Sequence, residues 1–286
     1  MPELPEVETV RDGLARHVLG AQIAGVQVLR DYSVRRHEGG PQDFCDQLTG
    51  ATIEYAARRG KFIWLGLAGR DDVLVAHLGM SGQILVRDAD FAAAALADPS
   101  LPGVRHLRVR MELTGGGSID FVDQRTFGYL TLSESVPTPD GLPRGVGTGL
   151  ARVPQLLAHI ARDLLDPAVA QGTPGRKDLI ARFKAKKTGI KRNLLDQELV
   201  SGVGNIYADE ALWLAKVHYA RPAGSLTKPK IAELLDSAEA VMRSSLSQGG
   251  TSFDSLYVNV NGESGYFAHS FTNRGSHFCP KCQRLR

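Results

Sequence analysis

The chain has 286 residues, of which 43% are hydrophobic and 23% charged, so it is long enough to bury its own core and to divide into two domains. Its net charge of +3 is a weak pointer to polyanionic partners, and its three cysteines are too few for a disulfide framework. No apolar run approaches the roughly 18 residues that cross a bilayer, and the start lacks the order of a signal peptide, which excludes a membrane protein and leads us to expect a cytoplasmic one.

The first half of the chain combines one helical pattern with several strand patterns. Apolar residues recur at helical spacing from Pro2 to Leu19, which predicts an amphipathic helix. Short β-rich runs separated by Gly, Asp and Pro clusters then predict strands at Gln22–Leu29, Thr52–Ala56, Lys61–Leu67, Val73–His77, Gln83–Arg87, His106–Leu113 and Ser118–Val122. This spacing favours a β-sandwich, with residues 88–102 as an alanine-rich excursion.

The second half is helical in pattern and follows a broken segment. Val136–Gly149 holds three prolines and four glycines in fourteen residues, which predicts a linker. Apolar residues at three- and four-residue steps then predict helices at Leu150–Leu165, Lys177–Lys184, Ile190–Val200, Ile206–Ala215 and Lys228–Ser247. We therefore expect an α+β fold with a β-sandwich domain flanked by helices (1–135), a linker (136–149), a helical domain (150–248), and a loop with a remnant hairpin (249–286).

Basic residues are concentrated in two places. Eight of them lie between Arg176 and Arg192 with a single acid, Asp178, and the last seventeen residues add four more with none. Such a run is typical either of a phosphate-binding surface or of a solvated helix face. A second signal is needed to choose between them.

The first residues carry a candidate nucleophile. If Met1 is removed, Pro2 presents a secondary amine, and an α-amino group titrates near pH 8, about two units below lysine, so a useful fraction is nucleophilic at neutral pH. Glu3 and Glu6 lie beside it on the first helical turn. The same residues also suit an ordinary capped helix, because proline favours the first turn and acids favour the positive end of the helix dipole.

Five separated motifs decide between these readings. They are MPELPEVETV (Met1–Val10), RRGK (Arg58–Lys61), HLGMSG (His77–Gly82), DQRTFG (Asp123–Gly128) and LLDQELVSGVGNIYADEAL (Leu194–Leu212). In this order they resemble the formamidopyrimidine-DNA glycosylase family, and the resemblance covers nearly the whole chain. It implies a bifunctional enzyme that excises oxidised purines such as 8-oxoguanine from duplex DNA and then cuts the strand as an AP lyase, with a helix–two-turn–helix DNA-binding domain.

The resemblance also implies four catalytic roles. Pro2 attacks the sugar C1′ and forms an iminium, and Glu3 is the acid that assists ring opening. Lys61 donates a proton in β-elimination, and Arg274 grips phosphate and assists δ-elimination. The cationic iminium acidifies the adjacent sugar proton, so the chemistry needs no cofactor.

Seven further residues are implied in binding DNA. Met80, Arg125 and Phe127 fill the gap left by the flipped base, and the planar donors of Arg125 recognise the orphaned base opposite. Phosphate contacts are implied for His77, His106, Lys186 and Asn205. Gly202 and Gly204 permit a tight turn that places Asn205 as the cap of the next helix, and residues 249–268 correspond to a loop that closes over the extruded base.

The chain departs from the family at its end. Relatives carry two Cys-x2-Cys pairs around a structural zinc, but only Cys279 and Cys282 are present here. His269 and His277 are poor substitutes, because His277 lies too near Cys279 to complete a tetrahedron easily. We expect half a zinc site without ordinary zinc binding. Because Arg274 is then held loosely, we expect intact base excision with either weaker DNA binding or poorer δ-elimination.

The expected partner is double-stranded damaged DNA, bound by a monomer in the bacterial nucleoid. Two alternatives stay open: a paralogue that binds damaged DNA without cutting it, and a glycosylase for oxidised pyrimidines. Members of the pyrimidine-specific group usually begin Met-Pro-Glu-Gly and lack the Arg–Phe pair, so Leu4, Arg125 and Phe127 favour purine lesions. A purely structural nucleic-acid protein would leave the N-terminal motifs unexplained.

Overall fold

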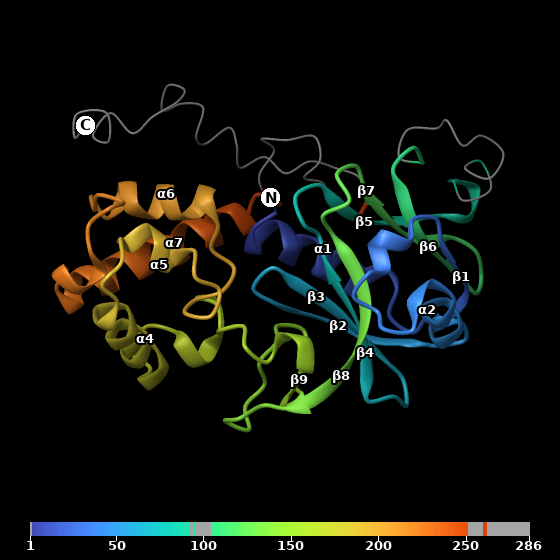
Figure 1. Cartoon of the computed structure of the whole chain (residues 1–286), viewed down its shortest axis with the longest axis horizontal. Coiled ribbons are helices and arrows are strands. Elements are labelled where there is room, and N and C mark those ends of the chain that lie inside the picture. Colours follow the sequence, from blue (N-terminus) through green and yellow to red (C-terminus); the bar gives the residue numbers. More distant parts are fainter. Residues whose placement is uncertain (1, 92–93, 95–103, 251–259, 262–286) are drawn as a thin grey trace.

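The computed structural model describes residues 2–91, 94, 104–250 and 260–261. Its α-helices are α1 (Leu4–His17), α2 (Gly40–Leu48), α4 (Pro174–Ala185), α5 (Ile190–Leu194), α6 (Asn205–Leu214) and α7 (Lys228–Leu246), with 3-10 turns η1 (Asp31–Val34), η2 (Gln155–Leu157), η3 (Pro167–Val169) and η4 (Ala223–Ser225). Its strands are β1 (Ile23–Val28), β2 (Ile53–Arg59), β3 (Phe62–Leu67), β4 (Asp72–His77), β5 (Gly82–Arg87), β6 (Leu107–Leu113), β7 (Ser118–Asp123), β8 (Tyr129–Pro137) and β9 (Arg152–Pro154). The strands gather on one side of the molecule and α4–α7 on the other, with α1 between them (Figure 1).

The strands form two antiparallel sheets, in the orders β1-β6-β7-β5 and β2-β3-β4-β8-β9. Apolar side chains from both sheets meet in one core, for example Ile63 and Leu74 from one sheet with Met111 and Phe121 from the other. The expected α+β fold with an N-terminal β-sandwich is therefore confirmed. All seven expected strands are present, whereas β8, β9 and α2 were not expected.

Helix α1 is stabilised both by the residues that cap its N-terminus and by its buried apolar face. Glu3 and Glu6 make a reciprocal capping box, and Pro5 lies in the first turn, where its missing N–H costs no hydrogen bond. Val7, Val10 and Leu14 are buried in the core of the sandwich. Leu4, one turn earlier, is buried in the core of the helical domain instead, so this one helix joins the two domains.

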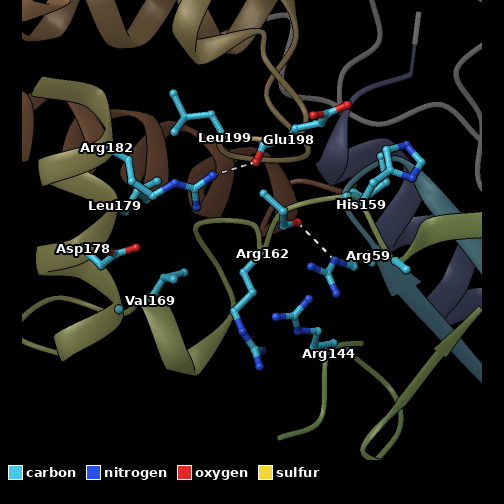
Figure 2. Close-up of a pocket in the computed structure, with 14 residues that line it drawn as sticks. Arg59, Arg144, His159, Arg162, Val169, Asp178, Leu179, Arg182, Glu198 and Leu199 are labelled. Atoms are coloured by element: carbon cyan, nitrogen blue, oxygen red, sulfur yellow. Dashed lines mark hydrogen bonds between the residues drawn. The ribbon is translucent and has the colours of Figure 1, made fainter. Parts of the chain in front are cut away.

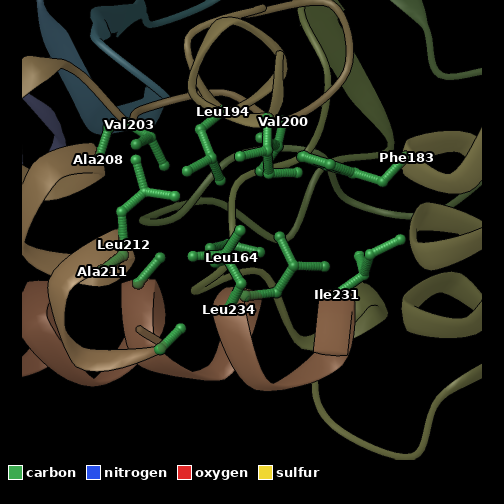
Figure 3. Packing of buried hydrophobic residues seen from close by; sticks show 14 of the residues in the cluster. Leu164, Phe183, Leu194, Val200, Val203, Ala208, Ala211, Leu212, Ile231 and Leu234 are labelled. Atoms are coloured by element: carbon green, nitrogen blue, oxygen red, sulfur yellow. The ribbon is translucent and has the colours of Figure 1, made fainter. Parts of the chain in front are cut away.

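The helical domain has its own core (Figure 3), built mainly from α4, α5, α6, α7 and the loops between them. The helix expected over Leu150–Leu165 is wrong, because Val153 pairs with Val136 in a strand and η2 follows directly. The helix expected over Ile190–Val200 ends at Leu194. Beyond it, Asp196 Oδ1 accepts the amide of Glu198 at 3.1 Å, which turns the chain instead of continuing the helix.

Buried polar contacts hold the two domains together. Arg58, at the end of β2, is 1% exposed and donates to Glu8 of α1 at 2.7 Å and to Asp163 of the helical domain at 2.8 Å. Asp163 also accepts the amide of Gly60 at 3.2 Å. The amide of Leu4 donates to the carbonyl of Gly202 at 3.0 Å, which fixes the start of α1 against the loop before α6.

Two further expectations concern the C-terminal segment and the membrane. The remnant hairpin and most of the loop at 249–268 lie outside the described residues. None of the helices within the described ranges combines the length and the hydropathy that crossing a lipid bilayer demands.

Candidate active site and nucleic-acid interface

The carboxylate of Glu3 lies at the N-termini of two helices. It caps α1 through the capping box, and it accepts the backbone amides of Gly204 at 2.7 Å, Ile206 at 2.9 Å and Tyr207 at 3.3 Å. These three amides belong to the first turn of α6, about 200 residues away in sequence, so the helical domain positions the expected catalytic acid. The positive ends of both helix dipoles face the carboxylate.

Burial nevertheless dominates the titration of Glu3. The residue is 3% exposed, and loss of hydration raises the pKa of its carboxyl from 4.5 to about 7. The Lys61 ammonium and the amide hydrogen bonds oppose this rise. Glu3 therefore titrates near neutrality, where a carboxyl can both hold and release a proton.

Lys61 and Pro2 belong to the same buried region. Lys61 follows the turn after β2 and is 7% exposed, and its burial lowers the pKa of its ammonium, while Glu3 and Glu6 act in the opposite direction. Pro2 is buried immediately before Glu3. The structure thus brings together the candidate nucleophile, an acid and an amine with a lowered pKa.

His77 ends β4 and pairs in register with Phe62 of β3. Its ring lies between Phe62, at 4.6 Å, and Tyr129, at 5.6 Å, measured between centroids. Burial and the charges of Lys61, Arg36 and Arg35 lower the pKa of His77 to about 4. The ring is therefore neutral at pH 7, and since its Nδ1 accepts the amide of Gly79 at 3.3 Å, its Nε2 carries the proton. His77 can therefore donate a hydrogen bond from its Nε2 to a phosphate while the ring itself is neutral.

Two turns carry the exposed apolar side chains expected to enter the base stack. Met80 lies in the turn before β5 and is 39% exposed, and Phe127 lies in the turn before β8 and is 55% exposed. The turns pack so closely that a Cβ on Gly79 would lie 2.5 Å from the amide nitrogen of Gly128. Arg125 is exposed in the second turn. Large apolar groups at two adjacent tips need an apolar receiver, which a gap in a base stack provides.

Buried Asp123 holds the two turns together. Its carboxylate accepts the hydroxyl of Ser81 at 2.5 Å and the amides of Arg125 at 3.1 Å and Gly128 at 2.8 Å. His106 adjoins the same turn, because its carbonyl accepts the amide of Asp123 at 2.9 Å. Partial desolvation and the neighbouring Arg108 and Arg105 lower the pKa of His106.

Asn205 is exposed in the first turn of α6, but it is not the helix cap that the sequence predicted. Gly204 occupies the N-cap position and has no side chain to offer, and the missing acceptor comes from Glu3 of the other domain. Asn205 therefore does not cap the helix, and it remains a candidate phosphate contact.

Lys186 is the C-cap residue that follows α4, and its ammonium lies 3.2 Å from the carboxylate of Asp196. Much of the surrounding basic run also serves internal contacts. Arg176 is buried and paired with Asp236 and Glu239, and Lys184 donates to the carbonyls of Gly224 and Leu226. Arg176 and Lys184 are thus structural, whereas Lys177, Lys186, Lys187 and Arg192 of the same run are exposed.

The sequence placed Glu6 beside Pro2 but did not reveal its contacts, nor the roles of Tyr207, Ser81 and Asp123 in supporting this site. Glu6 accepts the amide of Glu3 at 2.8 Å and the hydroxyl of Tyr207 at 2.7 Å, and Tyr207 in turn lies 2.6 Å from Ser245 of α7. Asp123, Ser81 and Tyr207 all lie inside the quoted motifs, so the signal was present. The motifs do not show, however, that Ser81 bonds to Asp123, 42 residues away, or that Tyr207 bonds to Glu6, 201 residues away.

Arg274, Cys279 and Cys282 lie outside the described residues, so their placement stays a prediction. Within the described ranges, no group of three or more His, Cys, Asp or Glu side chains is arranged to hold a metal ion. Cys45 is a free cysteine and is half-buried.

Comparison with known proteins agrees with this geometry. The profile of the formamidopyrimidine-DNA glycosylase N-terminal domain matches residues 1–130, and that of the formamidopyrimidine-DNA glycosylase H2TH domain matches residues 159–256. Formamidopyrimidine-DNA glycosylase of Streptomyces avermitilis is 47% identical over 308 aligned positions, covering 99% of this chain and 98% of the relative.

Two solved structures are similar along most of the chain. Wild-type Lactococcus lactis Fpg (MutM) in complex with DNA containing an oxidised pyrimidine has a TM-score of 0.73 at 27% identity, covering 98% of this chain and 91% of that one. MutM in complex with DNA containing carbocyclic 8-oxo-G has a TM-score of 0.72 at 27% identity, covering 94% and 86%. The chain therefore belongs to the formamidopyrimidine-DNA glycosylase family.

Proposed function

We propose that this DNA glycosylase excises oxidised purines, such as 8-oxoguanine and formamidopyrimidines, from duplex DNA and then cleaves the abasic strand through a Schiff base on Pro2. The observation that carries the proposal is the Glu3 carboxylate. It directly follows buried Pro2, is itself buried, and is held by three amides of α6. Solved relatives bound to DNA containing carbocyclic 8-oxo-G and Fapy-dG support the substrate class. We further propose that the enzyme acts as a cytoplasmic monomer and needs no cofactor for catalysis.

The proposed chemistry begins with the free amine of Pro2, after removal of Met1. Its nitrogen bonds to the sugar C1′ while the bond from C1′ to the base breaks and the base leaves with its electron pair. The nitrogen then loses its proton as the bond from C1′ to O4′ opens, and the Glu3 carboxyl delivers a proton to O4′. The product is a cationic iminium, which draws electrons from the neighbouring carbon–hydrogen bond.

Strand cleavage follows from that iminium. Loss of a C2′ proton expels the 3′ phosphate by β-elimination, and Lys61, whose pKa is lowered by burial, is the proposed group for proton transfer at this step. Loss of the 5′ phosphate by δ-elimination would use Arg274. Met80, Arg125 and Phe127 would fill the space of the extruded base, which offsets an unstacking cost of a few kcal/mol.

Pro2→Gly tests the covalent step. Borohydride reduces an iminium to a stable amine, so wild-type protein should be trapped on a duplex containing 8-oxoguanine opposite cytosine. The Pro2→Gly protein should give at least about 100-fold less adduct, because the secondary amine that makes an already cationic iminium is lost. Pro174→Ala, at an exposed proline that begins α4, is the matched control and should trap normally.

Two results would contradict the covalent proposal. One is undiminished trapping by Pro2→Gly, and the other is fully active protein in which mass spectrometry finds Met1 still attached. Tight binding of the duplex with no adduct from the wild type would indicate instead a protein that binds damaged DNA without cutting it.

Glu3 should give excision a pH dependence near neutrality. Because the pKa of its carboxyl is about 7, the protonated fraction that can protonate O4′ should fall about tenfold for each pH unit above 7. We expect single-turnover excision by the wild type to decline above pH 7, and this decline to be absent in a slower Glu3→Gln protein. Glu233→Gln, at an exposed carboxylate of α7, should keep the wild-type profile. A wild-type decline that persists in Glu3→Gln would assign the titration to another group.

Oxidised pyrimidines are a second candidate substrate class, because a solved relative with a similar fold is bound to DNA containing one. Excision rates on matched duplexes with 8-oxoguanine and with 5-hydroxycytosine separate the two classes. We expect faster excision of 8-oxoguanine, and a clear preference for 5-hydroxycytosine would assign the chain to pyrimidine repair.

A further inference from the structure

A cavity of about 320 Å³ lies at the junction of the two domains and shares no lining residue with the active site. The end of β2, the linker, the segment that enters the helical domain and α4 enclose it (Figure 2). Four arginines line it: Arg59, Arg144, Arg162 and Arg182. No step of the proposed reaction uses them.

Arg59 is the most unusual of the four. It is 2% exposed, and its Nε donates to the carbonyl of Ala161 at 3.1 Å. Its Nη1 is buried and has no hydrogen-bond partner within the described part of the chain. Asp163 and Asp166 act to raise the pKa of Arg59, but they are paired with Arg58 and Arg162. Burial together with the charges of Arg144 and Arg162 outweighs them and lowers the pKa of Arg59 to about 10. Positive charge is therefore in excess at this point.

The neighbouring arginines do not supply a counter-ion. Arg162 is neutralised by Asp140 at 2.8 Å and Asp166 at 2.5 Å. Arg144 has only a 3.5 Å contact with the same Asp140, and its Nε is buried without a partner among the described residues. The guanidinium groups of Arg59 and Arg144 point toward one another in Figure 2. Two adjacent guanidinium groups thus present unused donors to one cavity.

The two acids that line the cavity do not neutralise the excess positive charge of its arginines. Asp178 and Glu198 are both exposed, and Arg182 donates at 2.9 Å to the main-chain carbonyl of Glu198, which carries no charge. The volume lies at the lower end of the range for small-molecule pockets. A compact anion with several acceptor oxygens fits both the size and the donors.

We propose that this cavity binds a phosphate group, held by the guanidinium groups of Arg59 and Arg144. Guanidinium forks match phosphate oxygens in pairs, and the bound anion would bring negative charge to two guanidinium groups whose nearby carboxylates are already paired with Arg58 or Arg162. Since Arg59 belongs to the sandwich and Arg144 to the linker, the anion would also tie the linker to the domain junction. The phosphate comes either from a small free ligand or from a DNA backbone.

Titration calorimetry with inorganic pyrophosphate tests the proposal on the full chain. We expect Arg144→Gln, at a side chain that is 18% exposed, to weaken pyrophosphate binding at least tenfold. Arg182→Gln, at the exposed rim, should weaken it by a smaller factor. Arg243→Gln, at a 58% exposed arginine of α7, is the control and should bind as the wild type does. Equal binding by Arg144→Gln and the wild type would overturn the proposal, as would no binding by the wild type.

Saturating undamaged duplex separates the two sources. If pyrophosphate still binds, the cavity takes a free phosphate ligand. If the duplex displaces it and Arg144→Gln also weakens duplex binding and lowers its salt dependence, the ligand is a backbone phosphate. Displacement with duplex binding unchanged in Arg144→Gln would place the pyrophosphate in the DNA cleft and overturn the proposal.

Discussion

Gly204→Ala should lower the rate of base excision at least about 100-fold, although Gly204 touches no reacting atom, because a displacement of about 1 Å in a catalytic group costs this much. A Cβ at this position would lie 2.3 Å from the carboxyl carbon of Glu3 and 2.5 Å from its Oε1. The backbone of Gly204 has φ −123°, which any residue adopts, so the clash is with the carboxylate and not with the local conformation. Glu3 must therefore leave the amides that hold it.

Single-turnover excision and borohydride trapping on the same 8-oxoguanine duplex measure the effect. Gly149→Ala is the matched control, because a Cβ there would meet nothing within 4 Å, and it should leave both readouts unchanged. Binding of a duplex with an uncleavable abasic analogue should change less than threefold in Gly204→Ala, since the exposed DNA contacts are untouched. Excision within threefold of the wild type would show that the position of Glu3 does not limit the reaction.

Local patterns predicted the sandwich well because its strands alternate and its turns are marked by glycine and proline. They failed where partners distant in sequence decided the structure. Residues 150–165 carry apolar side chains at helical steps, yet Val153 adds to the sheet beside Val136, and pairing with an existing strand outweighs weak helix propensity. Gly13 shows the same limit, since a Cβ there would lie 2.5 Å from Val260, a contact that no local pattern encodes.

The candidate site divides in the same way. Its residues could be predicted from the sequence, because Pro2, Glu3, Lys61 and the two exposed turns lie in recognisable motifs. Its electrostatics were not, since the pKa of Glu3 reflects burial against a helix that begins about 200 residues later. The sequence predicts Asn205 as the cap of α6 because asparagine is a favoured N-cap residue, whereas Glu3 of the other domain supplies the acceptor.

Arg58→Met should lower the free energy of unfolding by about 3–5 kcal/mol, which is typical of removing one partner from a buried ion pair. The side chain of Arg58 is 1% exposed and that of Asp163 is 4% exposed, so the substitution strands a carboxylate that water cannot reach. Urea unfolding measures the loss. Arg243→Gln breaks the pair between exposed Arg243 and Glu239, which keeps its second partner Arg176, and should cost less than about 1 kcal/mol.

A second substitution separates the stranded charge from lost packing. Arg58→Met combined with Asp163→Asn removes the unpaired carboxylate and should recover part of the stability, because a neutral amide can still accept the amide of Gly60. The excision rate should be lowest in Arg58→Met and partly recovered in the double variant. The reason is that Asp163 holds the turn at Gly60, which immediately precedes Lys61. If the double variant is no more stable than Arg58→Met, the energy of this junction lies in its shape, and the ion pair between Arg58 and Asp163 contributes to specificity of docking without stabilising it.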